Sequence, residues 1–166
     1  PVLSKTPLDI VLVEPEIPGN TGSIARTCAA IGAALHLVHP LGFRTDDAAV
    51  KRAGLDYWYL VDIHHHDSFE SVAEMLADRY FFLASTKGGK RYDTGELTEA
   101  AALIFGKETR GLDEAILSRY PDRIFRIPIL EQARSLNLSN AVSVFAFECV
   151  RQRGFPGLEH TRRVHA

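Results

Sequence analysis

The sequence predicts an α/β fold in which a mostly parallel sheet of six strands is flanked by helices. Short apolar runs alternate with runs of helical spacing along the whole chain, which is typical of a parallel sheet covered on both faces. With 166 residues, of which 46% are hydrophobic and 24% charged, the chain can bury one core of ordinary size. We expect a single domain over residues 1–160, followed by a loose tail over residues 161–166.

Six runs have the length and the β-rich composition of buried strands. They are residues 8–13, 35–38, 57–63, 80–84, 102–105 and 124–129.

Five further runs have helical spacing or helix-start signals. They are residues 21–31, 46–52, 67–79, 113–120 and 141–150. Asn20 is a plausible N-cap for the first helix and Gly32 its end, while Asp67 and Glu70 resemble a capping box for the third. The last helix is apolar on almost every side, so it should be buried all round, within the fold or against a partner subunit.

Composition and cysteine usage narrow the class of protein. No apolar run approaches the roughly 18 residues needed to span a bilayer, and residues 1–8 lack the pattern of a signal peptide. Cys28 and Cys149 both lie in apolar helical contexts, so we expect reduced core cysteines in a cytoplasmic protein. The net charge of −2 argues against indiscriminate coating of nucleic acid, but leaves a local basic patch open.

The segments that follow the strands should hold any ligand, because ligands of parallel sheets bind beyond the carboxyl ends of the strands. These segments are residues 14–22, 85–89, 106–111 and 128–140. Gly106 and Gly111 bracket a turn where glycine allows close approach of the backbone to a ligand, although a charged surface turn is an alternative. The polar stretch 134–140 precedes the apolar helix, which would make it a rigid binding loop.

The familiar nucleotide and metal signatures are missing. No G-x-G-x-x-G follows the first strand, and Gly106-Lys107 lacks the flanking residues of a phosphate-binding P-loop. Residues 64–66 are three histidines, but consecutive side chains of an extended chain point to opposite faces. We therefore favour surface histidines before a helix cap over a zinc site and expect no metal. An unrelated α/β enzyme with a nucleotide cofactor would have to explain the absent glycine fingerprint.

Three ordered segments together resemble the motifs of the SPOUT (trefoil-knot) RNA methyltransferases of TrmH type. They are residues 18–26 (PGNTGSIAR), 105–112 (FGKETRGL) and 135–141 (SLNLSNA). Residues 14–18, 52–57 and 85–88 are similar to the TrmL/YibK branch, the tRNA wobble-position 2′-O-methyltransferases. The resemblance extends over about residues 9–157, and it departs at Gly19 and Lys107, where many relatives carry proline.

This resemblance implies a C-terminal trefoil knot and S-adenosyl-L-methionine bound in a bent shape by the knot loops. It also implies a homodimer, with the knot-region helices in the interface and the active site completed across it. Substrate and partner would be tRNA, with no role for DNA or membrane. The cofactor-binding residues carried over from the motifs are Ala84, Gly106, Ile127, Ser135, Leu136 and Leu138.

The implied activity is 2′-O-methylation of tRNA ribose at the anticodon wobble nucleotide, a cytidine or modified uridine. Alternatives are another tRNA or rRNA site, or a non-catalytic RNA-binding module. The resemblance gives Arg26 the role of general base. Because arginine keeps its proton to very high pH, a second possibility is that Arg26 stabilises oxyanion charge. Asn20, Glu108 and Asn137 would orient Arg26 and the ribose.

Overall fold

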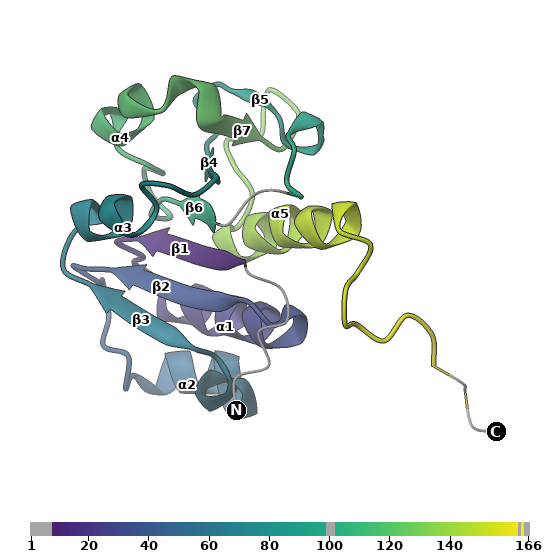
Figure 1. Ribbon diagram of the computed structural model, residues 1–166. Helices are drawn as coiled ribbons and strands as arrows, with labels where there is room; N and C mark the ends of the chain where they lie inside the picture. Colours follow the sequence, from purple (N-terminus) through teal and green to yellow (C-terminus); the bar gives the residue numbers. More distant parts are fainter. Residues whose placement is uncertain (1–7, 99–101, 163, 165–166) are drawn as a thin grey trace.

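A parallel sheet crosses the centre of the molecule (Figure 1). The computed structural model describes residues 8–98, 102–162 and 164. In that part of the chain the strands lie in the order β3 (Ile63–His66), β2 (Ala34–Val38), β1 (Asp9–Val13), β6 (Ala102–Phe105), β4 (Phe81–Ala84), β7 (Ile124–Arg126) and β5 (Lys90–Arg91), all pairing in parallel.

The predicted α/β class with a parallel sheet is confirmed, but the predicted number of six strands is wrong. The seventh strand, β5, is a two-residue edge strand that pairs with β7. Both of its residues, Lys90 and Arg91, are exposed. A strand so short and so polar lacks the apolar run by which buried strands are found in a sequence.

Helices cover both faces of the sheet. Alternate strand residues such as Ile10 and Leu12 face α1 (Pro18–Ile31) and α5 (Leu138–Gln152), while Val11 and Val13 face α3 (Phe69–Met75) and α4 (Glu114–Arg119). This alternation follows from the two-residue period of a strand. The remaining elements are α2 (Ala48–Gly54), which packs against α1, and the 3₁₀ helices η1 (Leu55–Leu60), η2 (Tyr92–Thr94) and η3 (Pro121–Arg123).

The third predicted strand is misplaced. Residues 57–60 belong to the 3₁₀ helix η1, and the strand begins only at Ile63. These residues still contribute to the core, because Trp58 and the following Val61 pack against the core side chains. The three histidines form most of β3, just before the helix cap as expected, but the predicted capping box of Asp67 and Glu70 is wrong: Ser68 caps α3 by accepting the N–H of Ser71.

Helix α1 starts earlier than its sequence suggests. It begins at Pro18, a residue suited to the first helical position because it has no N–H to leave unpaired. The extended residue Ile17 is the N-cap, so the expectation that Asn20 caps this helix is wrong; Asn20 lies buried in the first turn. The predicted end at Gly32 is confirmed, with a left-handed φ of 74°.

Buried thiols lie within α1 and α5. Cys28 and Cys149 are unpaired and buried, as expected. Burial raises the pKa of the Cys28 thiol to about 12 and that of Cys149 to about 11, so both remain protonated core residues at neutral pH. Within the described ranges, no helix is long and apolar enough to cross a bilayer.

A chain of hydrogen bonds runs through the histidines of β2 and β3. Asp9 accepts from Arg79 Nη2 at 2.6 Å and from His36 Nε2 at 2.8 Å. His36 Nδ1 lies 2.9 Å from His66 Nε2, and His66 Nδ1 lies 2.9 Å from Ser71 Oγ. Burial would raise the pKa of Asp9, but the bonds from His36 and Arg79 outweigh it and lower that pKa.

The hydrogen-bonded histidines are expected to make the protein less stable in mild acid. Burial, together with neighbouring histidines, lowers the pKa of His66 and of His65 below the ordinary 6.5. A group with a depressed folded pKa takes up its proton more readily in the unfolded chain. Its contribution to stability is therefore complete above pH 6.5 and is lost as pH falls through the folded pKa.

Urea denaturation at a series of pH values between 8 and 5 measures this effect. We expect the free energy of unfolding to fall as the pH drops below 6.5, and to fall less steeply in His66→Gln. A profile for His66→Gln parallel to that of the unmodified protein would remove His66 from the explanation.

Candidate functional site

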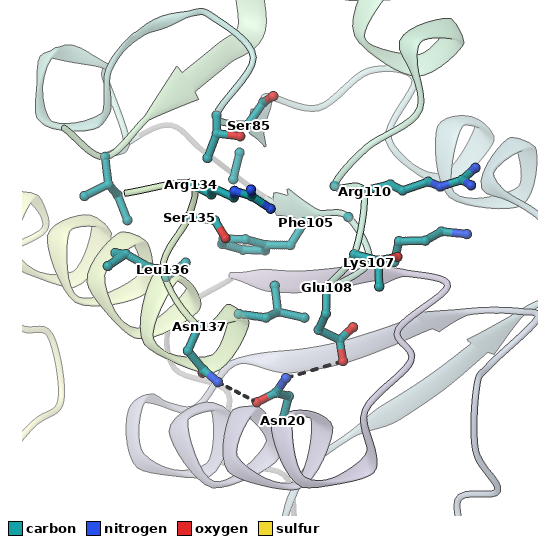
Figure 2. Close-up of a pocket in the computed structure, with 18 of the residues that line it drawn as sticks. Asn20, Ser85, Phe105, Lys107, Glu108, Arg110, Arg134, Ser135, Leu136 and Asn137 are labelled. Atoms are coloured by element: carbon teal, nitrogen blue, oxygen red, sulfur yellow. Dashed lines mark hydrogen bonds between the residues drawn. The ribbon is translucent and has the colours of Figure 1, made fainter. Parts of the chain in front are cut away.

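Four segments at the carboxyl ends of the strands enclose one cavity of about 690 Å³. Residues following β4, β6 and β7 line it, together with the first turns of α1 and α5 (Figure 2). The strands β1, β6, β4 and β7 are consecutive neighbours in the sheet, so the loops after them meet at one edge. The size and position are typical of a small-molecule site.

The cavity brings together nine of the ten site residues that the sequence indicates. Asn20, Glu108 and Asn137 line it, as do all six residues expected to bind the cofactor: Ala84, Gly106, Ile127, Ser135, Leu136 and Leu138. Arg26 is not among the lining residues.

A line of side-chain hydrogen bonds joins three of these residues at the base of the cavity (Figure 2). Asn137 Nδ2 donates to Asn20 Oδ1 at 3.1 Å, and Asn20 Nδ2 donates to Glu108 Oε2 at 3.4 Å. Asn137 Oδ1 also accepts the N–H groups of Ser139 and Asn140 at 2.9 and 3.3 Å, which caps α5. The line therefore fixes the start of α5 relative to the start of α1.

Glu108 supplies the anion that the N-terminus of α1 lacks. The first turn of α1 carries no acidic residue, and Ile17 makes no side-chain cap. The Glu108 carboxylate instead accepts the N–H of Glu16 at 2.9 Å and that of Ile17 at 2.5 Å. A carboxylate at this end of a helix satisfies N–H groups and complements the helix dipole.

Arg26 lies apart from this group. It is exposed on α1, six residues beyond Asn20, and its guanidinium stands 4.9 Å from the centroid of the Tyr57 ring. Asn20, Glu108 and Asn137 therefore orient one another and two helix starts. In a single chain they make no contact with Arg26 that the structure records.

Two aromatic lining residues were not singled out from the sequence as parts of the site. Phe105 and Phe145 contribute aromatic rings from the end of β6 and from α5, and their centroids lie 5.6 Å apart in an edge-on contact. Ser85 and Arg134, which fall in the predicted ligand segments 85–89 and 128–140, also line the cavity, and Figure 2 shows Arg134 lying between Ser85 and Phe105. Position just after a strand was the available signal for Ser85, whereas nothing local to Phe145 indicates a cavity.

The lining suits a nucleoside-like ligand. Apolar side chains such as Ile127, Leu136 and Leu138 line the cavity together with the glycines of the turn 106–111, and an adenine ring needs an apolar slot with nearby N–H and C=O groups. A Cβ at Gly106 would lie 2.0 Å from the carbonyl carbon of Gly111, so the turn closes tightly here. Among the described residues, no group of three or more His, Cys, Asp or Glu side chains could hold a metal ion.

The fold and this cavity define a ligand-binding α/β protein, and comparison with known proteins identifies its family. Residues 7–147 match the model of the SpoU rRNA Methylase family. The tRNA (cytidine(34)-2′-O)-methyltransferase of Aeromonas hydrophila subsp. hydrophila is 47% identical over 151 residues, covering 90% of this chain and 97% of that protein. The protein of the same name from Methylovorus glucosotrophus is 46% identical over 150 residues, with the same coverage of both chains.

Solved structures agree with this assignment. One, described as giving insights into the 2-OH methylation of C/U34 on tRNA, superimposes with a TM-score of 0.85 at 44% identity, covering 90% of this chain and 99% of that chain. The SpoU methyltransferase AviRb from Streptomyces viridochromogenes, in complex with AdoMet, gives a TM-score of 0.78 at 27% identity, covering 92% of this chain and 60% of that chain.

The chain belongs to the SpoU methylase family. The family resemblance read from residues 18–26, 105–112 and 135–141 is thereby confirmed, as is the prediction that the protein is an RNA methyltransferase.

Proposed function

We propose that the protein transfers a methyl group from S-adenosyl-L-methionine to the ribose 2′-oxygen of the wobble nucleotide of tRNA. The observation that carries this proposal is the joining of Glu108, Asn20 and Asn137 at the base of a nucleoside-sized cavity. The relatives named tRNA (cytidine(34)-2′-O)-methyltransferase, at 46–47% identity over nearly their whole length, support the same substrate.

In this proposal six cavity residues hold the cofactor. Ala84, Ile127, Leu136 and Leu138 supply the apolar slot, while Gly106 and Ser135 bring backbone groups close to it. The 2′-oxygen gains the methyl group as the sulfonium's sulfur–methyl bond breaks to leave S-adenosylhomocysteine, and the hydroxyl proton passes to water.

Asn20, Glu108 and Asn137 act by holding the reacting groups in place. Their bonds to one another and to backbone N–H groups leave little freedom at the base of the cavity, and a fixed geometry is a large part of the catalysis of a displacement reaction. Arg26 would stabilise the charge that develops on the ribose oxygen. It can do so only if a second copy of the chain brings it to the cavity.

A homodimer is therefore part of the proposal. The helix α5 was expected to be buried all round, within the fold or against a partner subunit, and Phe147 on it is 44% exposed in the single chain. Ser143 Oγ lies 3.2 Å from Thr27 Oγ1, so α5 and α1 lie side by side. A partner covering the exposed side of these two helices would bury Phe147 and meet Arg26, which is exposed on α1.

The finer features of the fold belong to the same proposal. After β7 the chain returns past β4 to reach α5, which packs on α1 and β6; a trefoil knot at this return is the expected form. We propose one domain over residues 1–160 with a tail over residues 161–166, of which residues 163, 165 and 166 lie outside the described part. A tRNA substrate supports a cytoplasmic location.

Nucleoside mass spectrometry tests the activity directly. The protein would be incubated with methyl-labelled S-adenosylmethionine and total tRNA from a strain lacking the enzyme, and the digest searched for labelled 2′-O-methylnucleosides. We expect label on the ribose of nucleotide 34, the position in the relatives' name. A matched anticodon stem-loop with 2′-deoxyribose at that nucleotide should accept no methyl group.

Two other results would contradict the proposed substrate. Label elsewhere in tRNA, or transfer only to rRNA when it is supplied in place of tRNA, would move the activity to another site, in line with the wider family name. Tight RNA binding without any transfer, and without cofactor binding by calorimetry, would indicate a non-catalytic RNA-binding module.

A further inference from the structure

Two loops of the site are joined by reciprocal hydrogen bonds, in which each loop's carboxylate accepts from the other loop. Glu108, on the turn 106–111, accepts the N–H groups of Glu16 and Ile17. In return Glu16 Oε1 accepts the N–H of Thr109 at 3.0 Å and its hydroxyl at 2.7 Å. Each loop thus supplies the acceptor for the other's backbone, and we refer to Glu16 and Thr109 as the outer clamp.

The outer clamp holds Glu16 in its ionised form. The hydrogen bonds from Thr109 lower the pKa of the Glu16 carboxyl, and the positive charges of Lys107 and Arg110 lower it further. Because this carboxyl faces solvent, salt and water weaken the charge attraction. The two directed bonds to Oε1 are therefore the contacts that matter for geometry.

The loop that carries Glu16 is itself fixed. Glu14 has a left-handed φ of 55°, and Gly42 donates its N–H to Pro15 O at 2.9 Å. A Cβ at Gly42 would lie 2.7 Å from Glu16 Cα, so the neighbouring loop presses directly on the backbone of Glu16. The carboxylate therefore projects from a rigid support.

The turn on the other side carries the residues of the site. Gly106, Glu108 and Thr109 all line the cavity, whereas Glu16 does not. Gly111 donates its N–H to Lys107 O at 2.8 Å, which closes the base of the turn. Thr109 lies exposed at its tip, and the bonds that its N–H and hydroxyl make in the described structure go to Glu16.

We propose that Glu16 is a positioning residue for methyl transfer. Through Thr109 it fixes the tip of the turn 106–111, so that Gly106 keeps its place in the cofactor wall and Glu108 its place beside Asn20. Glu16 touches neither the cofactor nor the ribose. This inference rests on the proposed function for its consequence on catalysis, but its consequence for ligand binding can be measured alone.

Paired variants separate the effect of the hydrogen-bond acceptor of Glu16 from the effect of its negative charge. Glu16→Ala removes the acceptor, whereas Glu16→Gln removes only the charge, because both Thr109 bonds go to a single oxygen that glutamine retains. Thr109→Val removes the hydroxyl and Thr109→Ser keeps it. Glu74→Ala, on the exposed surface of α3, controls for the loss of a negative charge.

The first measurement is the Kd of S-adenosylhomocysteine by calorimetry, with the melting temperature recorded for each variant. We expect Glu16→Ala and Thr109→Val to raise Kd by about tenfold, the usual scale for losing a hydrogen bond to a charged group. Glu16→Gln and Thr109→Ser should restore most of the affinity. The double variant Glu16→Ala/Thr109→Val should bind S-adenosylhomocysteine no more weakly than the weaker of these two single variants, because the two side chains act through one contact.

The second measurement is the split between kcat and the KM for tRNA. We expect kcat to fall about tenfold in Glu16→Ala while the KM for tRNA stays unchanged, since Glu16 orders the cavity and not the RNA surface. A Kd and kcat equal to those of Glu74→Ala would overturn the inference, even if the melting temperature drops. If the unmodified protein binds S-adenosylhomocysteine but methylates no tRNA, the proposed function fails, and the Kd series still decides the role of Glu16.

Discussion

Replacing Arg26 with alanine is expected to lower the rate of methyl transfer by about 100- to 1,000-fold, the scale of removing one donor to a developing oxyanion. Arg26→Lys should recover little, because a lysine lacks the planar, forked set of donors that a guanidinium presents. Binding of S-adenosylhomocysteine should stay near normal, since Arg26 does not line the cavity.

The position of Arg26 makes a sharper experiment possible. Its guanidinium lies over Tyr57 and outside the cavity of its own chain. If a second copy provides it, two inactive variants should restore each other's activity. One subunit would carry Arg26→Ala, and the other would carry Ile127→Glu, which places an unpaired carboxylate in the apolar cofactor slot.

Co-expression of the two variants with different tags gives mixed dimers. A mixed dimer has one site with an intact cavity and an intact arginine, so random pairing should return about a quarter of normal activity. No activity in purified mixed dimers would show that Arg26 serves the cavity of its own chain, or none. Each variant alone provides the control and should be inactive, with an elution volume unchanged from that of the unmodified protein.

The sequence predicts the cavity better than it predicts the helices and strands around it. The loops of the site were identifiable because each follows an apolar strand, and parallel strands end at one edge whatever their exact boundaries. Gly106, Ile127 and Ser135 therefore line one cavity, although the third predicted strand was misplaced.

What was missed depends on contacts between distant residues. The aromatic run 57–60 has the composition of a strand, yet it forms the 3₁₀ helix η1 that packs against α1. The exchange between Glu16 and Glu108 joins residues 91–93 positions apart, which no local pattern encodes. Arg26 shares a motif with Asn20, but six residues along a helix turn its side chain elsewhere, so its role at the cavity stays a prediction.

A methyl group added at Gly106 should disable the cofactor site outright. In Gly106→Ala the new Cβ would lie 2.0 Å from the carbonyl carbon of Gly111 and 2.1 Å from the nitrogen of Leu112. Both obstacles are backbone atoms, so no side chain can rotate away and the turn 106–111 must open. We expect a loss of about 2–3 kcal/mol of stability, the upper range for overpacking, and a Kd for S-adenosylhomocysteine raised by more than about 100-fold, since 1.4 kcal/mol is a factor of ten.

Gly19→Ala is the matched control for this prediction. Gly19 lies in the first turn of α1, where an added Cβ meets nothing within 4 Å. Alanine suits a helix better than glycine, so the protein should be equally stable or more stable by up to about 1 kcal/mol. Its melting temperature should therefore stay the same or rise. Thermal denaturation and calorimetry on the two variants compare the same chemical change in the turn 106–111 and in the first turn of α1. A Gly106→Ala protein that melts and binds like Gly19→Ala would mean that the turn has room to spare, and that the close approach of Gly106 to Gly111 is not what shapes the cofactor wall.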